Sequence, residues 1–207
     1  MPQPILVVGT GNRRKGKELA ELFSTAGLGL ELKTLADFPD AIRVEETGAT
    51  FAENAALKAT EQARHLGRWV LADDSGLAVD ALGGDPGVAS ARFSGPGATD
   101  ATNNRLLLEK LAATPLEQRT ARFVCRMALA DPSGTIRAES EGACRGRMLF
   151  APRGEQGFGY DPLFEVVEYH RTFAELGIAV KSCLSHRARA GRLLIPALVT
   201  LVDAGEL

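Results

Sequence analysis

The sequence predicts an α/β fold built around a mixed β-sheet. In the first half, predicted strands alternate with predicted helices, beginning with an apolar strand at residues 5–8 and a helix at about 14–26. In the second half, predicted strands at about 122–130 and 135–146 are separated by Asp131-Pro132-Ser133-Gly134, which is typical of a hairpin. Alternating elements followed by a hairpin indicate a mixed sheet.

The first helix is predicted by its periodicity. Leu19, Leu22 and Phe23 lie on one face of a helix at 14–26, and Gly27 provides a stop. Three later elements are predicted in the same way from glycine content and helical periodicity: a loop at 83–87, a helix at about 99–112 and a last helix at about 185–202.

Residues 30–74 supply the remaining elements of the first half. A weak alternation predicts a strand at 30–35. Thr50-Phe51-Ala52-Glu53 has the pattern of a capping box, which predicts a helix to about His65 that ends at Gly67. The apolar run that follows predicts a buried strand at 69–74.

Composition restricts the class of protein. A chain of 207 residues that is 45% hydrophobic can bury a core as one domain (1–207) or two closely joined lobes. A signal peptide and a run long enough to span a bilayer are both lacking, and three widely spaced cysteines suit a reducing cytoplasm. The net charge of −2 argues against bulk nucleic-acid binding. We therefore expect a cytoplasmic protein without a membrane or nucleic-acid partner.

Two adjacent acids, Asp73 and Asp74, stand where the predicted strand ends and Ser75-Gly76 begins. Ligand crevices form at such strand ends in α/β sheets. Neighbouring carboxylates also repel each other unless a metal or a water-activating role offsets that cost. The alternative is an ordinary turn, since Asp, Ser and Gly all favour turns.

A basic cluster follows the first predicted strand at Thr10-Gly11-Asn12-Arg13-Arg14-Lys15. The start of a helix with Arg and Lys around it is a ready phosphate site, although a solvated basic helix start is the alternative. A P-loop would need Ser or Thr at Glu18, and a dinucleotide fingerprint would need glycine at Arg14.

Two further groups of residues have the chemistry of a ligand site. Phe158-Gly159-Tyr160-Asp161-Pro162 places two rings and a carboxylate on a tight turn, which could contact a base or equally be a turn with core-facing rings. Lys181 and Ser185-His186-Arg187 form a second basic cluster, with Ser185 a possible cap of the last helix. Alone, each group also fits a structural role.

Taken together, the motifs resemble the inosine triphosphate pyrophosphatase family. The resemblance runs from Val7 to about Ala190 and rests on five ordered motifs: Thr10-Gly11-Asn12-x-x-Lys15; Glu46-Thr47-Gly48 with Phe51-x-Glu53-Asn54-Ala55-x-x-Lys58-Ala59; Ala72-Asp73-Asp74-Ser75-Gly76-Leu77 with Ser90-Ala91-Arg92-Phe93-Ser94-Gly95; Gly157-Phe158-Gly159-Tyr160-Asp161-Pro162; and Lys181-Ser182-x-x-Ser185-His186-Arg187. The chain departs from the family at Ala179-Val180, where acids are usual, and at Phe93, where tyrosine is common.

The resemblance implies a fold and a reaction. The fold would be an elongated, curved mixed sheet flanked by helices, with two lobes and a deep central cleft, and the protein would be a homodimer. The reaction would be magnesium-dependent hydrolysis of XTP, ITP and dITP to the monophosphate and pyrophosphate. The alternatives are a non-catalytic nucleotide sensor and a pyrophosphatase for other modified nucleotides, such as pyrimidines.

The resemblance also implies a role for each site residue. The triphosphate would be bound by Thr10, Gly11, Asn12, Arg13, Arg14, Lys15 and Lys58. Magnesium would be held by Glu46 and Asp74. Asp74 or Asp73 would activate the attacking water, with Asp74 favoured. The nucleoside would be contacted by Ser75, Phe158, Gly159, Tyr160, Asp161, Lys181, His186 and Arg187.

The implied base selectivity has a physical reason. Hypoxanthine and xanthine carry an oxygen at C6 that can accept hydrogen bonds from His186 or Arg187. Adenine has an amino group there and would leave those donors unpaired, which can discriminate by several powers of ten.

Overall fold

A computed structural model describes residues 3–207 of the protein. The expectation about the start of the chain rests partly on Met1 and Pro2, which lie outside the described residues. The chain divides into two compact units. The first unit contains residues up to Asp74, Cys125–Gly142 and Arg187–Leu207, and the second contains Ser75–Val124 and Ala143–His186. The deep cleft that the resemblance implies stays a prediction.

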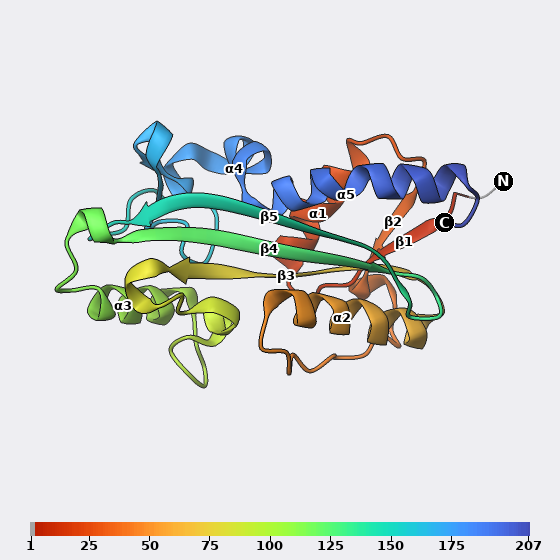
Figure 1. Cartoon of the computed structure of the whole chain (residues 1–207), viewed down its shortest axis with the longest axis horizontal. Helices are drawn as coiled ribbons and strands as arrows, with labels where there is room; N and C mark the ends of the chain where they lie inside the picture. Colours follow the sequence, from red (N-terminus) through yellow and green to blue (C-terminus); the bar gives the residue numbers. More distant parts are fainter. Residues whose placement is uncertain (1–2) are drawn as a thin grey trace. The chain divides into compact units, whose positions relative to one another are not determined.

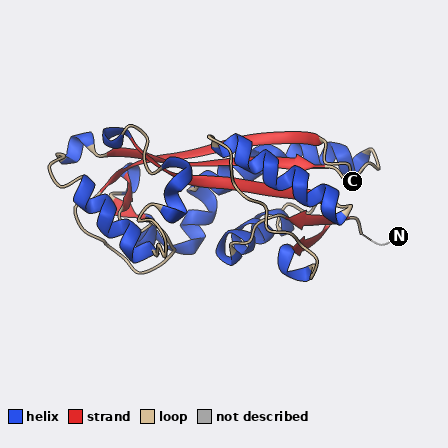
Figure 2. Ribbon diagram, turned by 90° about the horizontal axis from the view of Figure 1, so that it is seen from below, coloured by secondary structure: helices blue, strands red, loops and turns tan. Residues whose placement is uncertain are grey.

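Seven strands of the described chain form one sheet in the order β2-β1-β3-β4-β5-β6-β7. They are β1 (Ile5–Val8), β2 (Glu31–Thr34), β3 (Trp69–Val79), β4 (Thr120–Ala130), β5 (Ile136–Met148), β6 (Phe164–Val166) and β7 (Arg171–Thr172). β1 is parallel to β2 and β3, whereas β6 is antiparallel to β5 and β7. The predicted α/β class with a mixed sheet is therefore confirmed, and Figure 2 shows its strands in red with helices in blue.

Five α-helices accompany the sheet in the described residues: α1 (Arg13–Ser24), α2 (Phe51–Leu66), α3 (Asp100–Lys110), α4 (Phe173–Leu184) and α5 (His186–Asp203). α2 begins and ends as its sequence predicts. The Thr50 side chain accepts from Glu53 N, Glu53 caps in return, and Gly67 ends the helix in the left-handed region. None of the helices in the described range is both long and apolar enough to cross a membrane.

In the first unit, helices cover both faces of the strands (Figure 1). Leu19 of α1 and Leu194 of α5 pack with Leu71 of β3 in one buried cluster. Ala59 of α2 packs with Val70 of β3 in another. Because side chains of a strand alternate between faces, odd positions of this part of β3 face α1 and α5, and even positions face α2.

Strand β3 corrects the prediction that the strand ends at Asp74, because it continues to Val79. Ser75 and Gly76, which suggest a turn, lie inside the strand. A Cβ at Gly76 would lie 2.3 Å from Ser90 Oγ, and Leu77 N donates to that hydroxyl at 2.9 Å. Glycine at this position therefore allows a close approach of the chain at Ser90 rather than a turn.

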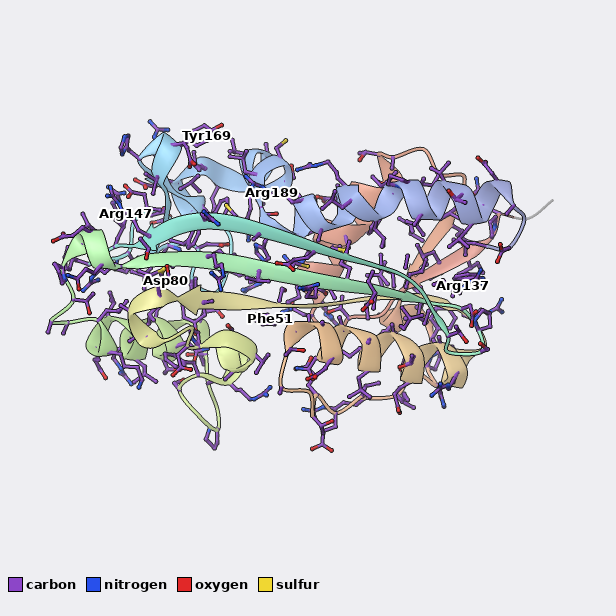
Figure 3. The ribbon with its side chains drawn as sticks, viewed as in Figure 1. Phe51, Asp80, Arg137, Arg147, Tyr169 and Arg189 are labelled. Atoms are coloured by element: carbon purple, nitrogen blue, oxygen red, sulfur yellow. The ribbon has the colours of Figure 1, made fainter. Side chains whose placement is uncertain are left out.

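The hairpin of β4 and β5 has the predicted turn, with Asp131 N donating to Thr135 O at 3.0 Å. Near it, Arg137 (labelled in Figure 3) forms an ion pair with Glu206, and its guanidinium carbon lies 5.6 Å from the centroid of the Trp69 ring. Trp69 Nε1 in turn donates to Glu206 O at 3.1 Å. These contacts hold the last residues of the chain against β3 in the first unit.

The second unit contains a helix that the sequence pattern did not predict. α4 begins at a capping box formed by Thr172 and Glu175, and it is interrupted at Gly177, whose φ of 79° and ψ of 173° are not helical. Phe173 at its start packs against Phe164 of β6, with ring centroids 5.5 Å apart. α4 therefore completes the aromatic core of this unit.

Arg119 links three segments of the second unit. Its side chain is buried and donates to Leu111 O at 2.6 Å, Thr114 O at 2.9 Å and Leu149 O at 3.0 Å. Leu111 is the C-cap of α3, so the guanidinium also lies at the negative end of that helix.

We expect Arg119→Met to destabilise the protein because Thr114 O and Leu149 O lose the guanidinium as donor, while Leu111 O keeps its bond from Thr114 N at 2.9 Å. Each buried unsatisfied group costs up to a few kcal/mol, and partial hydration should limit the total loss to about 3 kcal/mol. Urea unfolding of the variant and wild type measures this loss. The control is Arg105→Met, because the Arg105 side chain is 74% exposed. Equal unfolding midpoints for wild type and Arg119→Met would contradict the assignment.

Candidate functional site

The basic cluster begins α1 in the first unit. Asn12 is the N-cap, and its Oδ1 accepts hydrogen bonds from Arg14 N at 3.0 Å and Lys15 N at 3.3 Å. Three basic residues occupy the first turn, and residues 11–14 are exposed. This helix start therefore has the polarity and the charge to bind an anion. The side-chain oxygen of Asn12 thus caps α1, a role that the sequence position alone does not indicate.

Asp73 and Asp74 point to opposite faces of β3. Asp73 is at an odd position, on the face covered by α1 and α5, and Asp74 is on the face covered by α2. The strand geometry thus separates two carboxylates that the sequence places side by side. Their expected mutual repulsion is reduced, and each carboxylate has its own cations.

Asp73 is fully buried among donors from α1, β4 and α5. Its Oδ2 lies 3.6 Å from Lys15 Nζ, 3.4 Å from Arg187 Nε and 4.0 Å from Cys125 Sγ. The pKa of the Cys125 thiol is raised mainly by burial and, to a lesser extent, by the negative charge of Asp73. The thiol therefore stays protonated and can donate a hydrogen bond. Asp73 therefore holds the side chains of Lys15 and Arg187 in place, whereas Asp74 contacts Lys58.

Arg187 is buried in the first unit beside two acids. Besides Asp73, it forms an ion pair with Glu18 of α1 through Nη1. Burial disfavours its charge, but the two carboxylates raise the pKa of the guanidinium, which therefore remains ionised. Glu18, the residue that argues against a P-loop, thus has a role in holding Arg187.

Asp74 belongs to a second charged group with Glu46 and Lys58. Lys58 Nζ lies 2.9 Å from Asp74 Oδ1 and 2.8 Å from Glu46 Oε1. Asn54 Nδ2 donates to Asp74 Oδ2 at 3.4 Å, and Asn54 Oδ1 accepts from Gly48 N at 2.8 Å. The loop before α2 and the first two turns of α2 therefore orient this carboxylate.

Burial and charge act in opposite directions in this group. Burial raises the pKa of Asp74, and this exceeds the opposing attraction of Lys58 and Lys15. Burial would lower the pKa of Lys58, but the carboxylates around it raise the value, so the ammonium stays charged. A carboxylate with a raised pKa is better suited to accept a proton than an ordinary surface acid.

Glu46 and Asp74 are the two carboxylates here that could hold a metal ion. Both carboxylates contact the same ammonium group, so their oxygens converge on one small region. Mg²⁺ is commonly held by one or two carboxylates together with substrate phosphates. Within residues 3–207, no three His, Cys, Asp or Glu side chains come together as a possible metal site. The residues present therefore fit a metal that arrives with a phosphate ligand.

The second unit brings together Phe158, Asp161 and Lys181. Lys181 Nζ lies 2.6 Å from Asp161 Oδ2, and both side chains are buried. The same carboxylate oxygen accepts from Phe158 N at 2.8 Å. The Lys181 ammonium also lies 4.1 Å from the centroid of the Phe158 ring, within cation–π distance.

Tyr160 and His186 are buried in the second unit. The Tyr160 hydroxyl donates to Ser90 O at 2.9 Å, and burial raises its pKa. The His186 ring is stacked on Phe123, with centroids 4.9 Å apart and an interplanar angle of 13°. Tyr160 therefore has a structural anchor, and His186 has a fixed ring plane. Ser75 is the first residue of this unit in β3, directly after Asp74.

The residues predicted for the site therefore form two groups. The first unit contains Thr10–Lys15, Glu46, Lys58, Asp73, Asp74 and Arg187; the second contains Ser75, Phe158–Asp161, Lys181 and His186. Asn54 and Cys125 have no role predicted from the sequence, and Glu18 is predicted only as an obstacle to a P-loop. Asn54 lies within a motif quoted for the resemblance, but the contacts of Cys125 and Glu18 have no signal in the sequence.

Comparison with known proteins identifies close relatives of the chain. Residues 6–197 match the Ham1 family. A dITP/XTP pyrophosphatase of Rhodopirellula baltica is 51% identical over 97% of this chain and 96% of its own length. A dITP/XTP pyrophosphatase of Geobacillus kaustophilus is 54% identical over 89% of each chain.

Solved structures are similar as well. The structure of a HAM1 protein from Coxiella burnetii has a TM-score of 0.86 and 37% identity, and the match covers 96% of this chain and all of the other. A nucleoside-triphosphatase, described as a dITP/XTP pyrophosphatase, from Mycobacterium abscessus has a TM-score of 0.75 and 45% identity, with 95% of this chain and all of the other covered.

We expect Gly48→Ala to disturb the support of Asp74. A Cβ at Gly48 would lie 2.7 Å from both Asn54 Oδ1 and Glu53 Cβ, so the loop would have to move away from Asn54. Such overpacking costs about 1–3 kcal/mol, which urea unfolding can measure. The control is Gly16→Ala, where the nearest atom would be at 3.6 Å and helix propensity favours alanine. A Gly48→Ala protein as stable as Gly16→Ala would argue against this support.

Proposed function

The chain belongs to the Ham1 family, and from that membership we propose that it hydrolyses non-standard purine nucleoside triphosphates, such as dITP, XTP and ITP, to the monophosphate and pyrophosphate. The observation that carries the proposal is the group formed by Glu46, Lys58 and Asp74, in which a buried carboxylate and a second carboxylate both contact one ammonium group. Removal of such nucleotides would cleanse the nucleotide pool.

The proposed reaction is attack of water on the α-phosphorus. Asp74 accepts a proton from the water while the water oxygen forms a bond to the α-phosphorus. The bond between that phosphorus and the oxygen that bridges to the β-phosphorus breaks, and pyrophosphate leaves. Asp74 is preferred over Asp73 as the base, because Asp73 is fully buried and contacts Lys15 and Arg187.

The phosphates would be bound by the residues at the start of α1 and by Lys58. The charges of Arg13, Arg14 and Lys15, together with the positive end of the α1 dipole, favour an anion there. Lys58 already compensates two carboxylates and would also attract the phosphates. Fixed cations of this kind stabilise the charge that develops on the leaving pyrophosphate.

Magnesium would be held by Glu46 and Asp74 together with the phosphates. When bound, the metal would neutralise phosphate charge and make the α-phosphorus more electrophilic. The two carboxylates converge on the Lys58 ammonium, which supports this ligand pair.

The base would be recognised in the second unit. The Phe158 ring would stack on the purine, with Ser75, Gly159, Tyr160 and Asp161 shaping the nucleoside site and Lys181 held by Asp161. His186 would donate to the purine oxygen at C6 from a ring whose plane is set by stacking on Phe123. This donor would favour 6-oxopurines over adenine.

Arg187 would contact the base together with His186, as its place in the motif Ser185-His186-Arg187 implies. Its guanidinium contacts Asp73 and Glu18, so binding a purine oxygen would use a different N–H or replace a carboxylate partner. Its fixed position supports a role in aligning substrate.

The proposed assembly is a homodimer in the cytoplasm. The family resemblance supports the dimer. Cys125 and Cys144 are buried and Cys183 is exposed, and the described residues form no disulfide, which is compatible with a reducing compartment.

Product analysis tests the proposed function. With magnesium, we expect rapid release of pyrophosphate from XTP, dITP and ITP, slow release from dGTP and dATP, and loss of release when the metal is chelated. Orthophosphate as the product would place attack at the γ-phosphorus and contradict the proposal. Tight nucleotide binding without any product would support a sensor, and preference for modified pyrimidines would indicate a different pyrophosphatase.

We expect Asp74→Asn to retain the fold and nucleotide binding but to lower kcat at least about 100-fold, because the amide cannot accept the proton. Steady-state kinetics with ITP and equilibrium binding of the nucleotide separate these effects. Asp203→Asn, at the exposed end of α5, is the matched control and should retain full activity. Unchanged turnover in Asp74→Asn would refute its role as the base.

A further inference from the structure

The turn that carries Phe158 is built from flexible residues. Gly157 and Gly159 flank Phe158, and their φ angles are 82° and 63°, in the left-handed region. Glycine adopts this region easily but also leaves it easily. The sequence Gly-Phe-Gly therefore does not by itself hold the ring in one direction, and other contacts must do so.

Two side chains of α3 bind the residue that follows Phe158. Asp100 Oδ2 accepts from Gly159 N at 2.9 Å, and Asn104 Nδ2 donates to Gly159 O at 2.9 Å. Asp100 and Asn104 are four residues apart and so lie on the same face of the helix. One helix face thus presents an acceptor and a donor that match both backbone groups of Gly159.

Two hydrogen bonds, one from each adjoining peptide plane, restrict the backbone at Phe158. Gly159 N–H belongs to the peptide plane that follows the Phe158 Cα atom, and Asp100 holds it. Phe158 N–H belongs to the plane that precedes this atom, and Asp161 Oδ2 holds it at 2.8 Å. Because both adjoining planes are held, the φ and ψ angles of Phe158 are restricted, and so is the direction of its Cα–Cβ bond.

Asp100 and Asn104, here called the clamp, lie on a helix that is itself fixed within the second unit. Thr99 caps α3, and Asn103, between the two clamp residues, accepts from Ser94 N at 2.8 Å and donates to Ser90 O at 3.3 Å. Ser90 O also accepts from the Tyr160 hydroxyl. The turn and the first part of α3 are therefore connected through several independent contacts.

We propose that Asp100 and Asn104 are positioning residues that set the direction of the Phe158 ring and thereby the affinity and selectivity for 6-oxopurine bases. The inference rests on the proposed function, which assigns base stacking to Phe158. In the proposed site, neither residue is assigned to the phosphates or to the attacking water. Substituting either residue should therefore change KM and the preference among bases, whereas substituting Asp74 should change kcat.

The test compares Asp100→Ala with Asp100→Asn. Asp100→Ala removes the acceptor for Gly159 N–H, and we expect KM for ITP and the dissociation constant of inosine monophosphate to rise about tenfold, as for loss of one charge-assisted hydrogen bond, with kcat changed less than about twofold. The ratio of kcat/KM for ITP to that for GTP should fall. Asp100→Asn keeps a carbonyl oxygen at this place and should restore KM to within about threefold of wild type.

Asn104→Leu provides a second variant of similar size, in case Asp100→Ala does not fold. It removes the donor to Gly159 O, which holds the peptide plane after Gly159 and supports the Asp100 bond, and we expect a smaller change in KM and selectivity in the same direction. The control is Arg105→Ala, on the exposed side of α3, which should match wild type. Thermal unfolding of each variant identifies a loss of stability.

Three outcomes would overturn the inference. Unchanged KM and selectivity in folded Asp100→Ala or Asn104→Leu, with an active wild type, would refute the clamp alone. A fall in kcat and thermal stability without a change in KM or base preference would show a merely structural role. A wild type that releases no pyrophosphate from ITP would refute the proposed function and the inference together.

Discussion

The alternation of side chains along β3 is the constraint on which the charged group in the first unit depends. Asp73 and Asp74 are neighbours, and two buried carboxylates on one face would repel strongly. The pleat of the strand directs them to opposite faces, where different helices supply the compensating cations. Helices on both faces are therefore an electrostatic requirement as well as a means of burying apolar surface. The same separation allows one aspartate to anchor basic residues while the other faces Lys58.

Buried charges in both units are compensated before any substrate binds. Asp161 pairs with Lys181, and Arg119 is surrounded by three carbonyl groups. Burial of a charge is costly without such partners, and a site that already holds its charges in place needs little reorganisation when a reaction creates new charge. In the proposed function, the fixed carboxylates and cations would therefore serve both folding and catalysis.

Local patterns predicted elements whose ends depend on neighbouring residues. The capping box at Thr50 and the stop at Gly67 were recognisable because helix ends are satisfied within a few residues of sequence. The end of β3 was predicted too early, since Gly76 is explained by its distance from Ser90, which is a tertiary contact. α4 was missed although Thr172 and Glu175 form a capping box, because Gly177 interrupts its periodicity. In the site, the resemblance supplied residue types, but the Asp73–Arg187 and Lys58–Glu46 pairs required the fold.

The surroundings of Trp69 have a spectroscopic consequence. This is the single tryptophan of the chain, and it is buried in the first unit with its indole N–H bonded to Glu206 O and a guanidinium near its ring. Its fluorescence would report the first unit alone, whereas the far-ultraviolet circular dichroism reports helices of both. If the two signals change at different denaturant concentrations, the units unfold in separate steps, and a single free energy of unfolding would not describe the protein. The position of one indole ring thus makes the cooperativity between the units measurable without any label.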